Sequence, residues 1–191
     1  MNFLAHLWLT ERAGLPLAGA VLGDVLRGRI DTLGLPTALA ASVALHRRID
    51  AATDNHPTLV RLREGFPHGA RRYAGPVLDV VCDHLLARGW PRFHALSLSE
   101  FAAYAAARVA VEAPRFAAAG AAAPRTPAFA AWLTGYSEPA GVERALTRLA
   151  RRARRPLQVA AASAEWRSAA QRLAPDFDAL LDALLAVHRA G

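Results

Sequence analysis

Apolar residues recur along this chain at the three- and four-residue spacing of an α-helix. No strand-length run alternates apolar with polar side chains, so β-strands are not expected. The pattern predicts an all-α fold, a compact multi-helix bundle that forms a single domain over residues 1–191. The helices are predicted at 2–10, 16–28, 36–54, 57–65, 75–88, 97–112, 127–134, 139–154, 157–172 and 176–188.

Two helix starts and one connection can be placed from local sequence signals. Ser97 and Glu100 have the spacing of a capping box, in which each side chain bonds the backbone N–H of the other residue. Thr126 precedes a proline and is expected to be an N-cap residue. The low-complexity segment 117–124 is predicted to be a loose connection between helices.

Acidic residues and histidines gather in the first half of the chain, within helices that are otherwise apolar. His46, Asp50 and Asp54 step by four residues and therefore share one helix face. Asp79 and Asp83 are also four residues apart and are surrounded by Leu and Val. The remaining members of this set are Asp24, His6 and His84.

A carboxylate on the apolar face of a helix is costly unless it is paired, hydrogen-bonded or bound to a metal ion. Several inward-facing carboxylates near histidines would repel one another, and a divalent cation removes that conflict. The set therefore indicates a metal-dependent hydrolase, in which the metal activates water and holds a phosphate oxygen. Simpler interpretations stay open: His46 and Asp50 could form a surface pair, and His6 could be an ordinary core histidine.

Arginines flank these acidic segments and could recognise phosphate. Arg27, Arg47 and Arg72 are the nearest, and a planar guanidinium binds phosphate through paired N–H donors. A second basic block at 144–155 contains six arginines, four of which follow one helical stripe. That stripe could receive an acidic helix or nucleic acid, or it could be an ordinary solvated face. No aromatic residues alternate with these arginines, which makes a nucleic-acid partner the less favoured choice.

Composition adds a charge argument and a location. The net charge is +7, which suggests an acidic partner, although all 23 basic residues are arginine and biased codon usage would give the same excess. The single cysteine, Cys82, excludes an internal disulfide. No segment is long and apolar enough to span a membrane, and no basic residue precedes the first apolar run, so a cytoplasmic location is expected.

Four motifs occur in order in the first 90 residues: MNFLAHL, LGDVLRG, HRRIDAATDNHP and RRYAGPVLDVVCDHLLARGW. Together they resemble the acyl carrier protein phosphodiesterase family. The resemblance implies an all-α fold like that of HD phosphohydrolases, and a reaction that converts holo-acyl carrier protein into apo-acyl carrier protein and 4′-phosphopantetheine. It also implies a divalent metal, with Mn²⁺ expected and Mg²⁺ or Fe²⁺ as alternatives, and an acidic acyl carrier protein as the partner.

The clustered acidic residues and histidines, taken together with the family motifs, predict a site. Metal ligands are expected among Asp24, His46, Asp50, Asp83 and His84. Catalytic residues are expected to be Asp24, Arg47, Asp54, Arg72, Asp79 and His6. In this scheme the arginines stabilise charge on the phosphoryl oxygens, a carboxylate accepts a proton or orients a ligand, and a histidine protonates the leaving serine oxygen.

Two positions depart from the family pattern, and two rival functions stay open. Trp8 replaces a frequent histidine, which we interpret as a packing position, and Ala20 replaces a frequent asparagine. One rival is an HD-like hydrolase that acts on a nucleotide or another small phosphodiester. The other is a non-catalytic basic helical module that binds nucleic acid, for which the arginines at 144–155 would matter and Asp83 would not.

Overall fold

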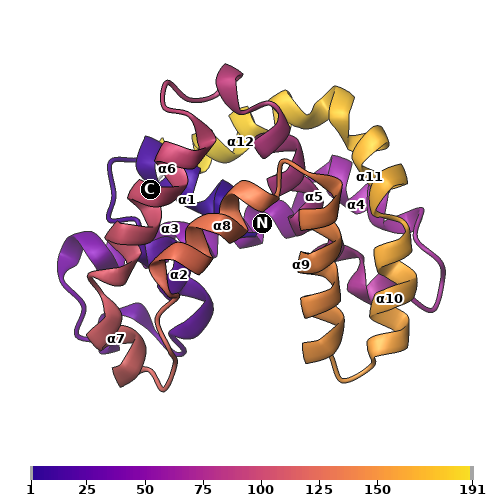
Figure 1. The fold of residues 1–191 in the computed structure, drawn as a ribbon. Coiled ribbons are helices and arrows are strands. Elements are labelled where there is room, and N and C mark those ends of the chain that lie inside the picture. The colour runs from indigo at the N-terminus through magenta and orange to yellow at the C-terminus, as the bar shows by residue number, and fades with distance from the viewer. Residues whose placement is uncertain (1, 190–191) are drawn as a thin grey trace.

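The computed structural model describes residues 2–189, and these contain helices but no β-strand. The ribbon forms an arch, with α9 and α10 in one limb and α2 and α7 in the other (Figure 1). The α-helices are α1 (Phe3–Arg12), α2 (Ala18–Val25), α3 (Thr37–Asn55), α4 (Pro57–Glu64), α5 (Ala74–Arg88), α6 (Leu98–Ala110), α7 (Ala113–Ala118), α8 (Thr126–Gly135), α9 (Pro139–Arg152), α10 (Pro156–Ala164), α11 (Trp166–Leu173) and α12 (Phe177–Arg189). Short 3₁₀ helices are η1 (Ile30–Thr32), η2 (Arg71–Tyr73), η3 (Trp90–Arg92) and η4 (Ala174–Asp176).

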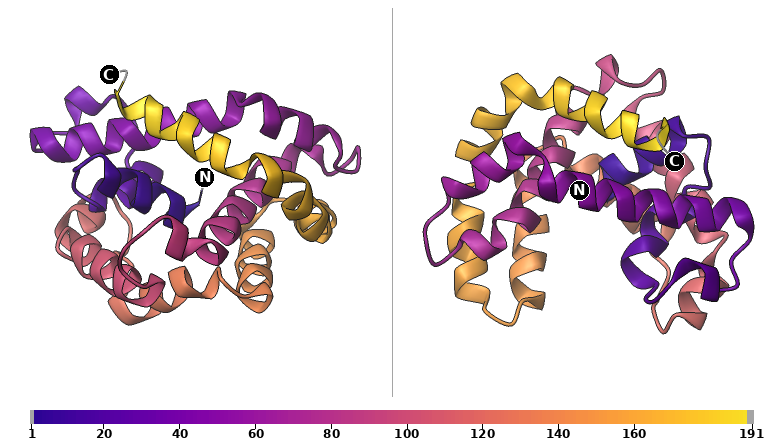
Figure 2. Two further views of the ribbon diagram at one scale, coloured as in Figure 1. Left: turned by 90° about the horizontal axis from the view of Figure 1, so that it is seen from above. Right: turned by 180° about the vertical axis from the view of Figure 1, so that it is seen from behind.

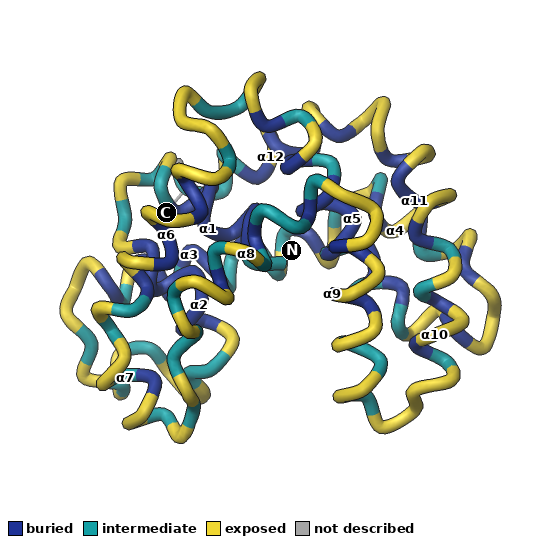
Figure 3. Tube along the Cα trace, viewed as in Figure 1, coloured by how far each residue is buried: buried dark blue, intermediate teal, exposed yellow. Residues whose placement is uncertain are grey.

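Helix α1 lies in the core of the molecule. Every residue from Leu4 to Thr10 is buried, and the tube of α1 is dark blue along most of its length in Figure 3. The helix packs against α2, α3 and α5, and the side chain of Asn2 caps its start by accepting the N–H of Phe3. Because neighbours enclose α1 on several sides, a polar side chain on this helix has a fixed position.

Helix α3 is the longest helix and runs beside α12 along one side of the molecule (Figure 2). Helix α2 approaches α3 closely, because a Cβ atom at Gly19 would lie 2.2 Å from Oγ of Ser42. The hydroxyl of Ser42 donates to the carbonyl oxygen of Pro16 at 2.8 Å, which fixes the start of α2 on α3. This close approach brings the polar residues of α2 and α3 together.

The all-α prediction is confirmed, with two notable differences in helix boundaries. The predicted helix 157–172 is two helices, because the chain turns at Glu165 and buries Trp166 at the start of α11. The predicted helix 16–28 ends early, at Val25. Leu26 is extended with ψ 126°, and Gly28 adopts a φ of +87° that favours glycine, so the helix cannot continue.

The local capping predictions have mixed outcomes. The capping box is confirmed, since Ser97 and Glu100 bond each other's backbone N–H. The N-cap prediction for Thr126 is wrong: Thr126 begins α8, and Arg125 occupies the cap position without a side-chain bond. The segment 117–124 is only partly irregular, because α7 extends to Ala118. Within residues 2–189, no helix combines the length and apolarity that a membrane span requires.

Candidate metal centre

Two imidazoles, one from α1 and one from α3, converge on one carboxylate of α3. One oxygen of Asp50 lies 2.9 Å from Nε2 of His6, and the other lies 3.1 Å from Nε2 of His46. The two imidazole rings stack with their centroids 4.1 Å apart. One ligand atom from each residue lies within 4.8 Å of the others, and residues 2–189 contain no second such group of His, Cys, Asp or Glu.

Helix α2 fixes the orientation of His46. The Nδ1–H of this imidazole donates to the carbonyl oxygen of Ala20 at 2.9 Å, so Nε2 points at the carboxylates. Gly23 makes room for the ring, because a Cβ atom there would lie 2.3 Å from two ring carbons of His46. A backbone acceptor on the far nitrogen is the usual support of a histidine that binds metal through Nε2.

Asp24 extends the cluster from the end of α2. Its Oδ1 lies 3.6 Å from Nε2 of His46, and its side chain is 55% exposed. Asp24, His46 and Asp50 line one pocket of about 340 Å³ together with Arg27 and Arg47. We call this pocket the metal pocket, because two residues of the cluster, His46 and Asp50, line it.

The two arginines of the metal pocket have different surroundings. Arg47 donates to the carbonyl oxygens of Gly28 and Leu26, at 2.7 and 3.0 Å, and so fixes the loop that follows α2. Arg27 lies on that loop, is exposed, and has no ion pair or hydrogen bond from its side chain within the described residues. Arg47, predicted to bind phosphate, therefore shapes the pocket wall, while Arg27 has its N–H donors available.

The cluster drives the pKa values of its two histidines apart. Burial lowers the pKa of His6 to about 4, despite the opposing hydrogen bond to Asp50. Burial acts in the same direction on His46, but the carboxylates of Asp24 and Asp50 outweigh it and raise the pKa of His46 to about 9. For Asp50, burial is outweighed by the two histidines, which hold its pKa well below the usual range. At neutral pH, His46 is protonated and His6 is neutral.

The donor atoms of this cluster suit a divalent cation. Imidazole nitrogen with carboxylate oxygen is a set that Mn²⁺, Fe²⁺ and Zn²⁺ accept, whereas Mg²⁺ would use mainly the carboxylates. Both Nε2 atoms face the same carboxylate, and the buried Nδ1 of His6 has no hydrogen-bond partner within the described residues. The Nε2 contacts of both rings thus converge where an ion would sit, and the arrangement is compatible with a divalent metal.

Asp83 and His84, expected among the metal ligands, do not join this cluster. The carboxylate of Asp83 is fully buried and accepts the backbone N–H groups of Leu4 and Ala5, both at 2.9 Å. The Nδ1–H of His84 donates to the carbonyl oxygen of Tyr136 at 2.7 Å, on another side of α5. Asp83 does face inward, as its apolar neighbours predicted, but its partner is the first turn of α1.

The contact of Asp83 with α1 positions His6. The N–H groups at a helix start have no partner within the helix, and a carboxylate there also interacts favourably with the helix dipole. Burial raises the pKa of Asp83 to about 7, although the N–H donors of Ala5 and Leu4 favour the charged form. His6 follows these two residues directly, so Asp83 fixes the segment that carries His6.

Two of the predicted catalytic residues, Asp54 and Arg72, make their contacts away from the cluster and its pocket. Asp54 forms an exposed ion pair with Arg63, with 2.7 Å between carboxylate oxygen and guanidinium nitrogen. Arg72 is exposed in η2, and its guanidinium carbon lies 5.2 Å from the ring centre of Tyr73. Neither residue lines the metal pocket.

Asp79 reaches the cluster through a second pocket. This pocket, of about 230 Å³, is lined by Asp79 and Asp24 among others, so it adjoins the metal pocket at Asp24. Burial raises the pKa of Asp79, with a further contribution from the negative charges of Asp50 and Asp54. Among the predicted carboxylates that are not part of the cluster, Asp79 is therefore the one that lines a pocket next to the metal pocket.

Sequence reasoning missed the backbone part of this site. It treated His6 as a proton donor, and it did not anticipate the carbonyl oxygen of Ala20 or the space that Gly23 provides. The side chain at position 20 departs from the family pattern, but the contact with His46 is made by the backbone carbonyl oxygen of Ala20. Trp8 is buried with its ring against Phe93, which confirms that position 8 serves packing.

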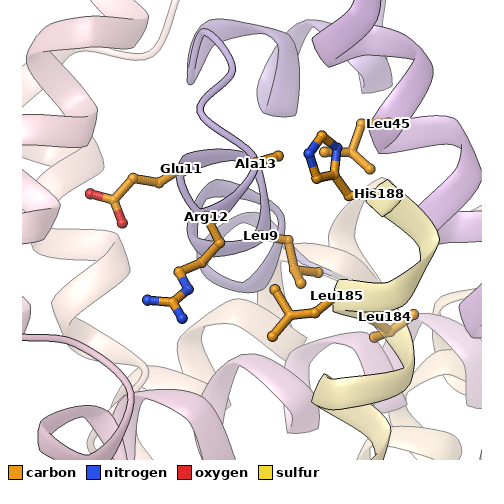
Figure 4. A pocket seen from close by; sticks show the side chains of 8 residues that line it. All are labelled: Leu9, Glu11, Arg12, Ala13, Leu45, Leu184, Leu185 and His188. Carbon is orange, nitrogen blue, oxygen red and sulfur yellow. The ribbon is translucent and has the colours of Figure 1, made fainter. Parts of the chain in front are cut away.

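A separate pocket of about 350 Å³ lies between the ends of α1 and α12 (Figure 4). Leu9, Leu184 and Leu185 form its apolar side. Its carboxylate, on Glu11, lies 2.9 Å from Nε2 of His94. None of the clustered residues lines this pocket, so it is distinct from the metal pocket.

Comparisons with known proteins identify the family of this chain. The family model described as acyl carrier protein phosphodiesterase matches residues 1–184. Proteins named acyl carrier protein phosphodiesterase from Salmonella dublin and from Enterobacter sp. (strain 638) are 44% and 42% identical to this chain over 115 residues. Each alignment covers 60% of this chain, and the chain spans only 59% of the length of these relatives.

The likeness to the family extends beyond the four motifs. The family match runs far beyond residue 90, where the motifs read from the sequence end. No solved structure matches the chain, and the expected likeness to HD phosphohydrolases therefore stays a prediction.

Proposed function

Because the chain belongs to the acyl carrier protein phosphodiesterase family, we propose that it is a metal-dependent phosphodiesterase that acts on holo-acyl carrier protein. The reaction releases 4′-phosphopantetheine and leaves apo-acyl carrier protein. The observation that carries the proposal is the convergence of His6, His46 and Asp50 beside the exposed guanidinium of Arg27. The proposed catalytic domain is the whole chain, and the proposed location is the cytoplasm.

The proposed ligands are His6, His46, Asp50 and Asp24, with Mn²⁺ as the expected ion and Mg²⁺ or Fe²⁺ as alternatives. When bound, the cation supplies Lewis-acid chemistry, since it lowers the pKa of water toward about 7 and offsets phosphoryl charge. The chain prepares this site through the backbone, because Ala20 orients His46 and Asp83 fixes the turn that precedes His6.

Arg27 is the proposed ligand for the phosphoryl oxygens. Its guanidinium lines the metal pocket without a competing ion pair among the described residues, and a guanidinium donates two parallel N–H bonds to phosphate. Arg47 contributes indirectly, since its bonds to the carbonyl oxygens of Leu26 and Gly28 fix the loop on which Arg27 lies. The contacts of Arg72 and Asp54 give no support for the roles expected of them.

The leaving serine oxygen needs a proton as its bond to phosphorus breaks, and we assign that proton to Asp79. This residue lines the pocket that adjoins the metal pocket at Asp24. Its raised pKa means that it keeps a proton at a higher pH than an ordinary aspartate does, which suits a general acid.

The direct test is a mass measurement on the substrate. Purified protein is incubated with holo-acyl carrier protein and Mn²⁺, with and without a chelator, and the carrier is weighed by mass spectrometry. We expect the carrier to lose its 4′-phosphopantetheine only when metal is available. An unchanged carrier with Mn²⁺, Mg²⁺ and Fe²⁺ alike contradicts the proposal. Cleavage of a nucleotide phosphodiester without cleavage of the carrier would support the rival hydrolase.

A further inference from the structure

Six arginines on α9 and the turn after it carry charge that nothing in the described part of the chain neutralises. They are Arg144, Arg148, Arg151, Arg152, Arg154 and Arg155, and all are exposed. Elsewhere the exposed arginines often have partners: Arg29 pairs with Asp31, and Arg167 pairs with Glu143. Because the six lie within twelve consecutive residues, their charges reinforce one another.

Two of these arginines border the proposed active site. Arg148 and Arg152 line the same pocket of about 230 Å³ as Asp24 and Asp79. The pocket thus has a basic wall on α9 and an acidic wall on α2 and α5. In Figure 1, α9 stands in the limb of the arch opposite α2. A substrate group bound here would lie between the basic wall and the metal pocket.

Arg148 is positioned rather than free to swing. Its guanidinium carbon lies 4.7 Å from the ring centre of Trp132, a cation–π distance. Trp132 in turn packs edge-on against Phe3 at the start of α1. The basic wall is therefore tied to the helix that carries His6, which fixes its distance from the cluster.

The substrate's chemistry indicates what this wall faces. A phosphodiester has two substituents, and in the proposed substrate one is a small neutral arm and the other is an acidic protein. In the proposed complex the metal pocket holds the phosphoryl group, so the carrier protein must lie outside this pocket, against its rim. The rim at Asp24 opens onto the pocket with Arg148 and Arg152. Guanidinium groups pair with carboxylates through matched N–H donors, and the carboxylate of Asp24 repels acidic side chains from the opposite wall.

We propose, resting on the proposed function, that Arg148 and Arg152 form the docking site for the acidic surface of the carrier protein beside its modified serine. Nucleic acid fits this surface less well, because Arg148 covers the ring of Trp132 and no aromatic residue occurs within the sequence of the arginine segment, residues 144–155.

The test measures binding separately from turnover. The affinity of labelled apo-carrier protein is measured by fluorescence anisotropy for the wild type, for the pair Arg148→Glu with Arg152→Glu, and for the matched pair Arg151→Glu with Arg154→Glu. Charge reversal on the docking wall should weaken binding by at least about tenfold, because like charges then meet across the interface. The matched pair removes the same charge from positions that do not line the pocket, and it should lose no more than about threefold.

Two further measurements separate the effect of charge from the effect of misfolding. The pair Arg148→Lys with Arg152→Lys retains the charge and should recover most of the affinity, and melting temperatures confirm that each variant folds. Equal losses for the two Glu pairs, or no loss for either, overturn the docking site. Tighter binding of a single-stranded oligonucleotide that depends on the same two arginines overturns it in favour of nucleic acid.

Failure of the docking site and failure of the proposed function give different results. Asp50→Asn should bind apo-carrier like the wild type while it lacks turnover. If the wild type cleaves no carrier yet binds it through Arg148 and Arg152, the interface holds and the proposed reaction fails. If it cleaves carrier with an unchanged KM after both arginines are reversed, the reaction holds and the docking site fails.

Discussion

The imidazole rings of His6 and His46 stack 4.1 Å apart and share the carboxylate of Asp50, one oxygen to each ring. The two rings come from different helices, and both are almost fully buried. Two imidazolium ions at this separation would repel each other, and the structure avoids this because only His46 has a raised pKa. Asp50 is thus the residue on which both histidines depend.

Replacing Asp50 should disable the centre while preserving the fold. Asp50→Asn keeps the shape of the side chain but removes its charge and one of its two acceptor oxygens, so one histidine loses its acceptor. Mutation of a residue that only supports a metal ligand lowers metal affinity or activity about 10- to 100-fold. Asp50 is itself a proposed ligand, so we expect metal affinity and activity each to fall by more than about 100-fold. Isothermal titration with Mn²⁺ and the carrier mass assay measure the two effects.

Asp31→Asn is the matched control for this variant. Asp31 is an exposed aspartate that pairs with Arg29, outside the metal pocket. It should bind metal and cleave carrier like the wild type. Metal affinity that is unchanged in Asp50→Asn would remove Asp50 from the ligand set.

Metal binding should strengthen with pH up to about pH 9. In the metal-free protein the carboxylates hold a proton on His46, with a pKa of about 9, whereas His6, with a pKa of about 4, is already neutral. A metal ligand must be deprotonated, so a proton competes with metal for His46 below pH 9. The apparent affinity should rise about tenfold per pH unit between pH 6 and 9 and then level off.

The proton itself can be counted in the same experiment. Titrations in buffers of different ionisation enthalpy should show about one proton released per bound metal at pH 7. A pH-independent affinity over this range, with no proton released, would show that His46 does not bind the ion.

Gly23→Ala should damage the centre although alanine favours helix. The added Cβ atom would lie 2.3 Å from the ring of His46, so the imidazole must move away from Asp50 and Ala20. Overpacking of this kind costs about 1–3 kcal/mol in the free energy of unfolding. We expect metal affinity to fall by at least about tenfold, as when a supporting contact of a ligand is lost.

Gly75→Ala makes the same chemical change in α5 without the clash. The nearest atom to its new Cβ lies 3.7 Å away, an ordinary contact. Its free energy of unfolding should stay the same or rise by up to about 1 kcal/mol. Equal metal affinity in the two variants, measured by titration, would show that position 23 does not control His46.

Asp83→Asn should act on folding rather than on metal ligation. At pH 5 the wild-type carboxyl is protonated, and its hydroxyl oxygen can still accept an N–H group. The NH2 group of the amide cannot accept, so one of the two buried N–H donors of Leu4 and Ala5 loses its partner. At pH 5 the free energy of unfolding should fall by about 1–3 kcal/mol, measured by urea denaturation. Below the temperature of unfolding, the variant should still bind Mn²⁺.

The penalty for Asp83→Asn should shrink as the pH rises from 5 to 7. The pKa of Asp83 is raised to about 7 in the folded protein from an ordinary value of 3.8, so the folded state binds more protons than the unfolded state between these values. The stability that Asp83 contributes is therefore present below pH 3.8 and is lost as the pH rises through 7. Asp83→Asn lacks this dependence, and a penalty that grows with pH would contradict the assignment.

Spacing along a helix predicted part of this site and could not predict the rest. The four-residue step correctly placed His46 and Asp50 on one face, because that relation depends only on helix geometry. The contribution of His6 depends on how α1 crosses α3, which no local pattern contains. Asp83 shows the same limit, since its apolar neighbours revealed burial but could not distinguish a metal ion from two backbone N–H groups as its partner.

The link between Asp83 and the first turn of α1 also sets the smallest fragment in which this centre can be studied. A chain cut after α3 would contain every proposed metal ligand, yet it would lack the carboxylate that holds the segment before His6. Peptide models or minimal designs that copy only the ligands should therefore bind metal weakly, unless they extend through residue 83 or supply another acceptor for the N–H groups of Leu4 and Ala5.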